Sequence, residues 1–342
     1  MAARVGWTRV GSRHRSKRSF RYLDAAGREI TDEQKLERIR SLAIPPAWKD
    51  VWISPSARGK LQATGVDAAG RKQYLYHPAY RAKQEQAKYD KLIRFAERLP
   101  QLREAMARHM ELEGLPPEKV AAIATRLINL GWFRVGGDRY AKRSRTFGIT
   151  TLRKSHVSVR GSRVSFRYRG KHSIMLRSAV VDAELAAAVK ELLALPGQRL
   201  FQYVQPDGTR CNLDQRRLND YVKEHLGEEF SAKDFRTWGG TLLAAIGLAE
   251  QDPPENPTQA KRRIAAVMRN VAEKLGNTPA VARSSYVSPA VVEQYLDGRT
   301  IADFRPRHLR VVGARDVSLD REEQATLSLL RSWRIRESRA AA

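Results

Sequence analysis

The hydrophobic period of the sequence changes near Pro78, and this change constrains the fold more than any other feature. Before Pro78, apolar and polar residues alternate over short runs bounded by turn residues, which is typical of strands. One helix interrupts these runs, beginning at Thr31 and ending before Pro45. We therefore predict a β-rich domain over 1–78, with strands at 20–24, 28–30, 51–54, 61–64 and 71–76.

Beyond residue 78 the period becomes helical, so residues 79–342 are predicted to form a second, mainly α-helical domain. The period returns to two between 156 and 177, which predicts a three-stranded antiparallel meander inserted among the helices. The predicted fold class is therefore α+β. Helices are expected at 79–110 with a break near Pro100, from Pro116 to Gly131, and at 182–195, 213–226, 231–250, 258–275, 289–297 and 320–338.

The charge balance is far from neutral, with 63 basic and 37 acidic residues and a net charge of +26. Such an excess needs a polyanionic partner or a solvated surface, and nucleic acid is the commonest such partner. The first nineteen residues contain no acid, and we favour a phosphate-binding arm there over an organellar transit peptide. The basic side chains of this arm are Arg4, Arg9, Arg13, His14, Arg15, Lys17 and Arg18.

Three features bear on the cellular compartment. No run of eighteen apolar residues exists, so we expect no membrane-spanning helix. The basic start is not followed by an apolar segment, so a secretory signal is not expected. The single cysteine, Cys211, cannot form an intramolecular disulfide, which suits a reducing cytosol. We therefore predict a cytoplasmic protein.

Two common sources of phosphate chemistry are not found in the sequence. The run Gly65-x4-Gly70-Arg71-Lys72 approaches a phosphate-binding P-loop, but its lysine and hydroxyl are out of place. No cluster of His, Cys or carboxylate residues offers a metal site. We therefore expect no cofactor.

The segment 275–286 is the strongest candidate for a reactive site. Gly276 can take the left-handed conformation that ends a helix, and Thr278 with Pro279 can begin the next one. Tyr286 then falls at the far end of a short helix, with Arg283 nearby. A buried core tyrosine is the commoner reading of such a residue taken alone, so the rest of the chain has to decide.

Four further residues stand at informative places: Arg134 after the helix that ends at Gly131, Lys171 in a hairpin turn, Arg236 in the first turns of a helix, and Asn277. Each charged side chain alone is more often solvated. Together with Tyr286 they form a coherent set for phosphoryl transfer. Attack on a phosphodiester gathers charge on the non-bridging oxygens, which two guanidiniums can neutralise with bidentate hydrogen bonds.

The remaining roles follow from the same chemistry. The 5′ oxygen leaves as a poor alkoxide unless a general acid protonates it, and Lys171 suits that role. The phenol of Tyr286 needs cationic neighbours to ionise readily, because its unperturbed pKa is about 10. The amide of Asn277 can donate to a non-bridging oxygen without changing the charge.

At this point the chain resembles a family, the type IB DNA topoisomerases of the short poxviral and bacterial branch. The motifs follow in order over about 20–300: Arg134-x-Gly136-x3-Tyr140, Gly170-Lys171, Lys233-Asp-Phe-Arg236 and Gly276-Asn277-Thr278-Pro279…Tyr286. The strand at 71–76 is similar to the family's N-terminal DNA-contacting strand. The resemblance implies DNA contacts for Gln73, Tyr74, Tyr76, Gly136, Tyr140 and Lys233.

The resemblance also implies an activity. A monomer would close as a C-shaped clamp on duplex DNA in the bacterial nucleoid, and Tyr286 would form a 3′-phosphotyrosyl link that permits strand rotation and rejoining without ATP or metal. Arg134, Arg236 and Asn277 would stabilise the phosphorane, and Lys171, aided by Arg134, would protonate the leaving oxygen. Two positions depart from the pattern. Asn277 stands where many relatives have histidine, and His172 replaces an acid that often follows the lysine.

Two other classes share part of the pattern. Tyrosine recombinases have a similar catalytic half, but they usually carry His-x-x-Arg where this chain has Lys233-x-x-Arg236, and a helical N-terminal half where strands are predicted here. A non-catalytic basic nucleoid protein would explain the charge but leave the five-residue set a coincidence. A covalent adduct with DNA after denaturation distinguishes that last class from the first two.

Overall fold

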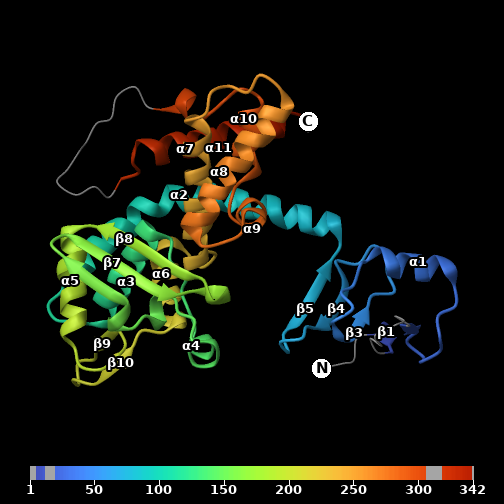
Figure 1. Cartoon of the computed structure of the whole chain (residues 1–342), viewed down its shortest axis with the longest axis horizontal. Helices are drawn as coiled ribbons and strands as arrows, with labels where there is room; N and C mark the ends of the chain where they lie inside the picture. The colour runs from blue at the N-terminus through green and yellow to red at the C-terminus, as the bar shows by residue number, and fades with distance from the viewer. Residues whose placement is uncertain (1–4, 12–19, 306–317, 341–342) are drawn as a thin grey trace. The chain divides into compact units, whose positions relative to one another are not determined.

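The computed structural model describes residues 5–11, 20–305 and 318–340. It divides into two compact units, Met1–Tyr89 and Asp90–Ala342, each with its own packed elements (Figure 1). Both strands and helices are present in a small N-terminal sheet, a larger helical unit and a small antiparallel sheet of three strands, so the predicted α+β class is confirmed. Most of the predicted basic arm, residues 1–4 and 12–19, lies outside the described residues.

The first unit is an antiparallel five-stranded sheet with the order β2-β1-β3-β4-β5 and one helix, α1. Its core gathers Trp7, Ile39, Val51, Ile53 and Ala63 between sheet and helix. The bounds are β1 Trp7–Val10, β2 Arg21–Leu23, α1 Glu33–Ser41, β3 Lys49–Ile53, β4 Leu61–Val66 and β5 Lys72–Tyr76.

Two details of this sheet differ from the prediction. The strand expected at 28–30 is a single bridge between Leu23 and Glu29, because a tight turn at Asp24 leaves no room for a longer ladder. A strand was not expected at Trp7–Val10, within the basic arm. Its pairing with β2 and β3 buries Trp7, and such long-range pairing leaves no mark in a short local pattern.

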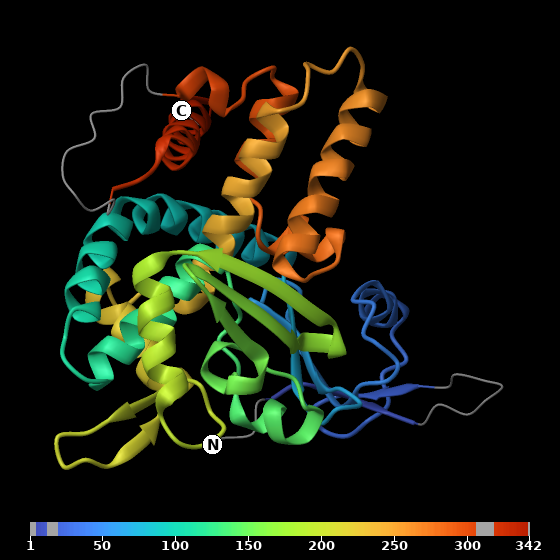
Figure 2. The same cartoon turned by 60° about the vertical axis from the view of Figure 1, so that its left-hand side comes forward.

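The second unit is mainly helical. In Figure 2, α7 and α8 lie side by side and α9 lies at the foot of α8. The helices that follow the first unit are α2 Pro78–Met110, which runs across the division between the units, then α3 Pro117–Gly131, α4 Asp138–Ser144, α5 Ala183–Ala194, α6 Gln215–Leu226, α7 Ala232–Ala249, α8 Pro257–Leu275, α9 Pro279–Ser285, α10 Pro289–Leu296 and α11 Arg321–Ala340.

The break expected near Pro100 is wrong, since α2 continues through this residue. Proline removes one backbone hydrogen bond and costs about 3 kcal/mol in a helix interior. The apolar residues on both sides of it, Phe95, Leu99 and Leu102, are completely buried. Burying one such side chain contributes roughly 1.5–3 kcal/mol, so packing holds the helix together across the proline.

A second sheet of three antiparallel strands lies among the helices, as predicted. Its strands are β6 Val157–Arg160, β7 Arg163–Arg169 and β8 Met175–Val181. Val164, Phe166, Tyr168 and Val180 are buried on one face, where α3 and α5 pack. The short hairpin of β9 Gln202–Val204 and β10 Arg210–Asn212 and the helix α4 were not predicted.

Candidate active site

Two helix ends position Tyr286, and both match the signals in the sequence. Helix α8 ends at Gly276, whose φ of 61° is left-handed. The side chain of Thr278 then accepts a hydrogen bond from the backbone of Val281 at 3.3 Å, and Pro279 begins α9. Tyr286 ends α9 and donates its backbone N–H to Ala282. The short helix therefore holds the tyrosine at a fixed distance from the end of α8.

Helix α7 holds the backbone of Tyr286 in place through hydrogen bonds and close packing. The hydroxyl of Thr241 donates to the Tyr286 carbonyl at 3.3 Å and accepts from the N–H of Ser288 at 3.0 Å. A Cβ atom at Gly240 would lie 2.7 Å from the Tyr286 carbonyl oxygen, so only glycine allows this approach. The tyrosine backbone is thus attached to the helix that carries Arg236.

Arg236 is 4% exposed and binds the carboxyl-terminal ends of two helices. It donates to the carbonyl of Trp132, which caps α3, at 2.5 Å and to the carbonyl of Leu275, the last residue of α8, at 2.8 Å. Carbonyl groups at a helix end carry partial negative charge, so they stabilise a buried cation. The guanidinium carbon lies 4.9 Å from the ring centroid of Tyr286.

Arg134 reaches the same end of α8. Trp132 is left-handed with φ 51° and turns the chain out of α3 towards Arg134. The Arg134 guanidinium donates to the Gly276 carbonyl at 2.9 Å and to the side-chain oxygen of Asn277. Burial lowers the pKa of Arg134, and repulsion from Arg236 lowers it further, although Tyr286 and Tyr168 oppose these effects. An anion between the two arginines would relieve their repulsion.

The electrostatics single out Tyr286 among the tyrosines of this unit. Burial raises the pKa of its phenol, but the charges of Arg236, Arg134 and Lys233 outweigh burial, so the pKa lies below the ordinary value. Tyr168 shows the contrast: burial raises its pKa to about 12 although the same two arginines act on it. The same two arginines therefore act on both phenols, but only the pKa of Tyr286 falls below the ordinary value.

Two buried donors in this cluster have no partner among the residues that the structure describes. They are Nε of Arg236 and the side-chain nitrogen Nδ2 of Asn277. A buried donor without a partner costs about 1–3 kcal/mol, and such groups gather at functional sites. The two arginines and Asn277 can thus offer hydrogen bonds to an anionic ligand.

Lys171 lies apart from these contacts, on the exposed turn between β7 and β8. His172 and Ser173 both have φ 60°, and the turn is closed by a hydrogen bond of 2.8 Å from Gly170 to the Ile174 carbonyl. Within the described ranges, no hydrogen bond joins Lys171 to Asn277, and Lys171 cannot pair with Arg134 or Arg236 because all three are cations. At the base of the turn Leu176 packs on Gly170, and its side chain also closes over Gly276.

Three of the residues with predicted DNA contacts lie in this unit. Tyr140 on α4 is 56% exposed, and Lys233 in the first turn of α7 is exposed as well. Gly136 has φ 91° and lies so close to Gly148 that a Cβ atom would come within 2.9 Å of its Cα. Close packing therefore accounts for the glycine at this position without a ligand.

The other three lie on β5, the edge strand of the first unit. Tyr74 and Tyr76 are 49% and 39% exposed and stack with centroids 6.2 Å apart. Lys72 extends this row at one end, 5.9 Å from the Tyr74 ring, and Tyr80 at the other. Gln73 points to the opposite face, where its amide donates to Asp67 at 2.9 Å. The predicted alternation of β5 is present, and it separates Gln73 from the two tyrosines.

Sequence reasoning missed several supporting residues. The ring of Trp132 lies against α7, where a Cβ atom at Gly239 would lie 2.1 Å from its indole nitrogen. The adjacent pair Gly239-Gly240 was the available signal, since glycine in a helix interior costs up to about 1 kcal/mol and implies a close neighbour. Tyr168 and Thr241 left no local signal, because their contacts are long-range.

The arrangement defines a class before any comparison: an α+β protein that gathers a tyrosine and two arginines around the end of one helix. A sequence model described as the catalytic core of eukaryotic DNA topoisomerase I matches residues 77–302. Another, described as the N-terminal domain of bacterial DNA topoisomerase IB, matches residues 19–67. The chain therefore belongs to the type IB DNA topoisomerases, which are isomerases that act on DNA.

Individual relatives agree with this assignment. DNA topoisomerase 1B of Acanthamoeba polyphaga mimivirus is 32% identical over 290 residues, which span 83% of this chain and 86% of the viral protein. DNA topoisomerase 1B of vaccinia virus (strain Copenhagen) is 21% identical over 273 residues, which span 78% of this chain and 83% of the viral protein. The predicted family and activity are thus confirmed, and they are favoured over the two alternatives, a tyrosine recombinase and a non-catalytic nucleoid protein.

No helix in the described ranges is long and apolar enough to cross a membrane. Likewise, the described part of the chain contains no group of three or more His, Cys, Asp or Glu residues that could hold a metal ion.

Proposed function

We propose that Tyr286 is the nucleophile of this topoisomerase. Its phenolate oxygen attacks the scissile phosphorus, the bond from phosphorus to the 5′ oxygen breaks, and a 3′-phosphotyrosyl link and a free 5′ hydroxyl result. The reverse attack by the 5′ hydroxyl rejoins the strand after the duplex has rotated, so no ATP is consumed. The observation that carries this proposal is the Arg236 guanidinium 4.9 Å from the Tyr286 ring, in agreement with a phenol pKa below its ordinary value.

Arg134, Arg236 and Asn277 act in the proposal on the non-bridging oxygens. Charge grows on these oxygens as the phosphorane forms, and donors already held in place stabilise it at no cost of reorganisation. Arg236 is held by two backbone carbonyls and retains an unpartnered Nε. Asn277 accepts from Arg134 and keeps its amide nitrogen for the phosphate. Asn277 can donate a hydrogen bond, as the histidine of many relatives can at this position, but unlike histidine it cannot carry a proton.

Lys171 is proposed as the general acid for the 5′ oxygen, aided by Arg134. Its exposure on a two-residue left-handed turn leaves the side chain free to approach bound DNA. Tyr140 and Lys233, with Gly136 in the segment between α3 and α4, are proposed to contact the backbone of the same duplex. Tyr74, Tyr76 and Gln73 are proposed to contact it from the first unit.

One chain carries every proposed catalytic residue, so we propose a monomer, which sedimentation at working concentration would test. The match of residues 19–67 to a bacterial N-terminal domain supports action on the chromosome in a bacterial nucleoid. Microscopy of a tagged full-length chain would show whether it follows the nucleoid.

The direct test is relaxation of a supercoiled plasmid in chelator without nucleotide. The wild type should relax the plasmid and, after denaturation, leave a covalent adduct on a 3′ end. Tyr286→Phe should fold, bind duplex DNA and form no adduct, because it lacks only the hydroxyl. An adduct formed by this variant, or relaxation that requires ATP or magnesium, would exclude the mechanism.

A further inference from the structure

The outer face of the three-stranded sheet carries an unusual concentration of positive charge. Five exposed arginines lie on it, and from Val157 to Val181 the sequence contains no aspartate or glutamate. None of the five has an ion-pair partner among the described residues. We call this surface the arginine face; its members are Arg160, Arg163, Arg167, Arg169 and Arg177.

Strand register places like charges directly opposite each other on this face. Arg160 on β6 pairs with Arg163 on β7, and Arg167 on β7 pairs with Arg177 on β8. Like charges in cross-strand pairs destabilise a sheet, so the unliganded protein bears a cost here. The acid that follows β8 in the sequence, Asp182, already binds Arg126 at 2.5 Å. A bound anion would supply the counter-charge that these arginines do not receive through ion pairs with the described residues.

A hollow of about 480 Å³ lies on the same face, between the two arginine pairs. Three of the arginines, Arg163, Arg167 and Arg177, line it together with the cross-strand serines Ser158 and Ser165. Guanidinium and hydroxyl donors together are typical of phosphate contacts in DNA-binding proteins. The face begins next to the Lys171 turn and runs along β7 for roughly 20 Å, which equals about six phosphates of one DNA strand.

We propose that the arginine face binds the phosphate backbone of the duplex being cleaved, beyond the cleavage site. The proposal rests on the proposed function of Lys171, whose turn joins the arginine face to the catalytic cluster. Continuity with that turn favours the same duplex over a second DNA molecule.

Arg163→Ala tests the proposal, with Lys190→Ala as a matched control, because Lys190 is exposed on α5 and α5 covers the opposite face of the sheet. Without DNA, Arg163→Ala should melt at a higher temperature than the wild type, since one repulsive pair is removed. With a long duplex, its DNA-induced rise in melting temperature should be smaller, and the slope of log affinity against log salt should fall by about one. Lys190→Ala should change neither.

Duplex length distinguishes this surface from the catalytic site. On a duplex that ends just beyond the cleavage site, Arg163→Ala should form the Tyr286 adduct at the wild-type rate, and a slower rate there would overturn the proposal. Failure of the wild type to form the adduct would count against Tyr286 and not against the arginine face. An unchanged salt slope on long duplex would overturn the proposal. So would a defect confined to bridging of two separate duplexes.

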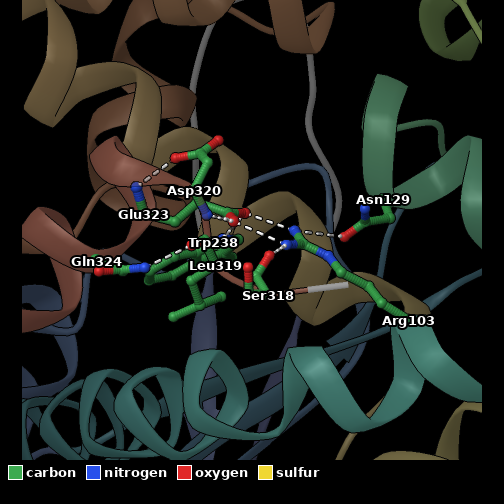
Figure 3. A network of polar contacts seen from close by, with 8 residues as sticks. All are labelled: Arg103, Asn129, Trp238, Ser318, Leu319, Asp320, Glu323 and Gln324. Atoms are coloured by element: carbon green, nitrogen blue, oxygen red, sulfur yellow. Dashed lines mark hydrogen bonds and ion pairs between the residues drawn. The ribbon is translucent and has the colours of Figure 1, made fainter. Parts of the chain in front are cut away.

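A second inference comes from a buried ion pair that joins α2 to α11 and also contacts α7. Arg103 on α2 binds Glu323 on α11 through both carboxylate oxygens, at 2.7 and 2.9 Å (Figure 3). The side chains are only 14% and 7% exposed. Glu323 also accepts from the indole of Trp238 at 3.3 Å, and it receives the backbone N–H of Asp320 at 3.1 Å. Asp320 in turn accepts from the N–H of Glu323, which completes a capping box.

Two of the elements that meet here, α7 and α3, position the two arginines of the proposed catalytic site. Trp238 follows Arg236 by two residues on α7. Arg103 also contacts Asn129 at 3.5 Å, in the last turn of α3, from which the chain continues to Arg134. From this convergence we infer that Glu323 is a positioning residue: it fixes α7 against α2 and α3 so that Arg236 meets the phosphate. The C-terminal helix would then be part of the active-site scaffold.

Glu323→Gln keeps the shape and an acceptor for Trp238 but removes the charge that holds Arg103. Small displacements of a catalytic group cost up to about 100-fold in rate, so single-turnover cleavage should slow by about 10- to 100-fold while DNA affinity stays unchanged. Glu97→Gln is the control, since Glu97 joins the same two helices through an exposed ion pair with Arg331 at 2.6 Å, and within the described ranges no hydrogen bond or ion pair joins Glu97 to α7. It should cleave at the wild-type rate.

A double-mutant cycle separates positioning from general loss of structure. In an Arg236→Ala background, Glu323→Gln should cause no further loss of cleavage rate, because the group that it positions is gone. Two defects that multiply would overturn the inference, as would a wild-type rate for Glu323→Gln. A defect in DNA affinity alone would also overturn it.

Discussion

At the scale of single residues, Lys171 differs from the other proposed catalytic groups because it is exposed and outside the hydrogen-bonded cluster. Lys171→Ala leaves Arg134, Arg236 and Asn277 in place, so the phosphorane remains stabilised while the 5′ oxygen leaves without a proton. General acid catalysis is typically worth about 10²–10⁴-fold, and cleavage should fall by that factor. Single-turnover cleavage of a duplex with a defined site measures it.

A sulfur atom in place of the bridging 5′ oxygen provides the control, because a thiolate leaves without protonation. The Lys171→Ala defect should largely disappear on this substrate, whereas Arg236→Ala should stay impaired, since it removes charge from the non-bridging oxygens. An equal Lys171→Ala defect on both substrates would make Lys171 a phosphate-binding residue and not the acid.

Tyr286 should titrate below the ordinary phenol value of about 10. Its folded pKa is depressed, so ionisation in the folded protein stabilises the fold above the unfolded pKa, and this contribution is lost as the pH falls through the folded pKa. The difference in absorbance between the wild type and Tyr286→Phe should show that the phenolate of Tyr286 forms at a lower pH than an ordinary phenolate. Arg236→Ala should move this titration to higher pH, and an unmoved titration would remove Arg236 as its cause.

At the scale of elements, the junction of α8 and α9 depends on Gly276. Alanine there must take a left-handed φ of 61°, and its Cβ would lie 2.7 Å from a methyl of Leu176. The backbone costs about 1–2 kcal/mol and overpacking about 1–3 kcal/mol, so Gly276→Ala should lower the free energy of unfolding by roughly 2–5 kcal/mol.

The comparison variant is Gly298→Ala. Gly298 has φ 75° but no atom within 4 Å of the added Cβ, so only the backbone cost of about 1–2 kcal/mol applies. Urea unfolding of both variants measures the difference. Equal losses in the free energy of unfolding would show that the Leu176 side chain moves aside, so that its close packing on Gly276 does not constrain the residue at this position.

The same junction shows what a sequence can predict. Gly276, Thr278 and Pro279 act on their own backbone, so their spacing alone predicted where α8 ends and α9 begins. Pro100 was misjudged because the apolar residues beside it are buried, and Phe95 packs on Phe230 and Phe235, which are distant in sequence. Signals that act within one turn are readable from sequence, and those that depend on packing are not.

The candidate site divides in the same way. Its five members were predicted from residue type and resemblance, but the reason that Arg236 tolerates burial was not, since its partners are the backbone carbonyls of Trp132 and Leu275. Every residue has a carbonyl, so the sequence cannot mark these two. The unpartnered nitrogens of Arg236 and Asn277 are likewise visible only in three dimensions.

At the scale of the whole molecule, the net charge of +26 predicts how binding should respond to salt. Each phosphate that a basic side chain neutralises releases counterions, so many contacts make the affinity depend steeply on ionic strength. Affinity for duplex DNA should fall about 10³-fold or more between ~50 and ~200 mM salt. Titration of a labelled duplex at several salt concentrations measures this.

The salt dependence of DNA affinity should also change how processively the enzyme relaxes a population of plasmids. At low salt, slow dissociation lets one bound molecule relax a plasmid completely before it leaves, so fully supercoiled and fully relaxed forms coexist. At high salt, release after few rotations should shift all topoisomers together. The cleavage rate inside the bound complex should change little, because the arginines and Tyr286 are held by short, partly buried contacts that salt screens weakly. Tight binding that ignored salt, with no change in the topoisomer pattern, would contradict a backbone-tracking mode of binding.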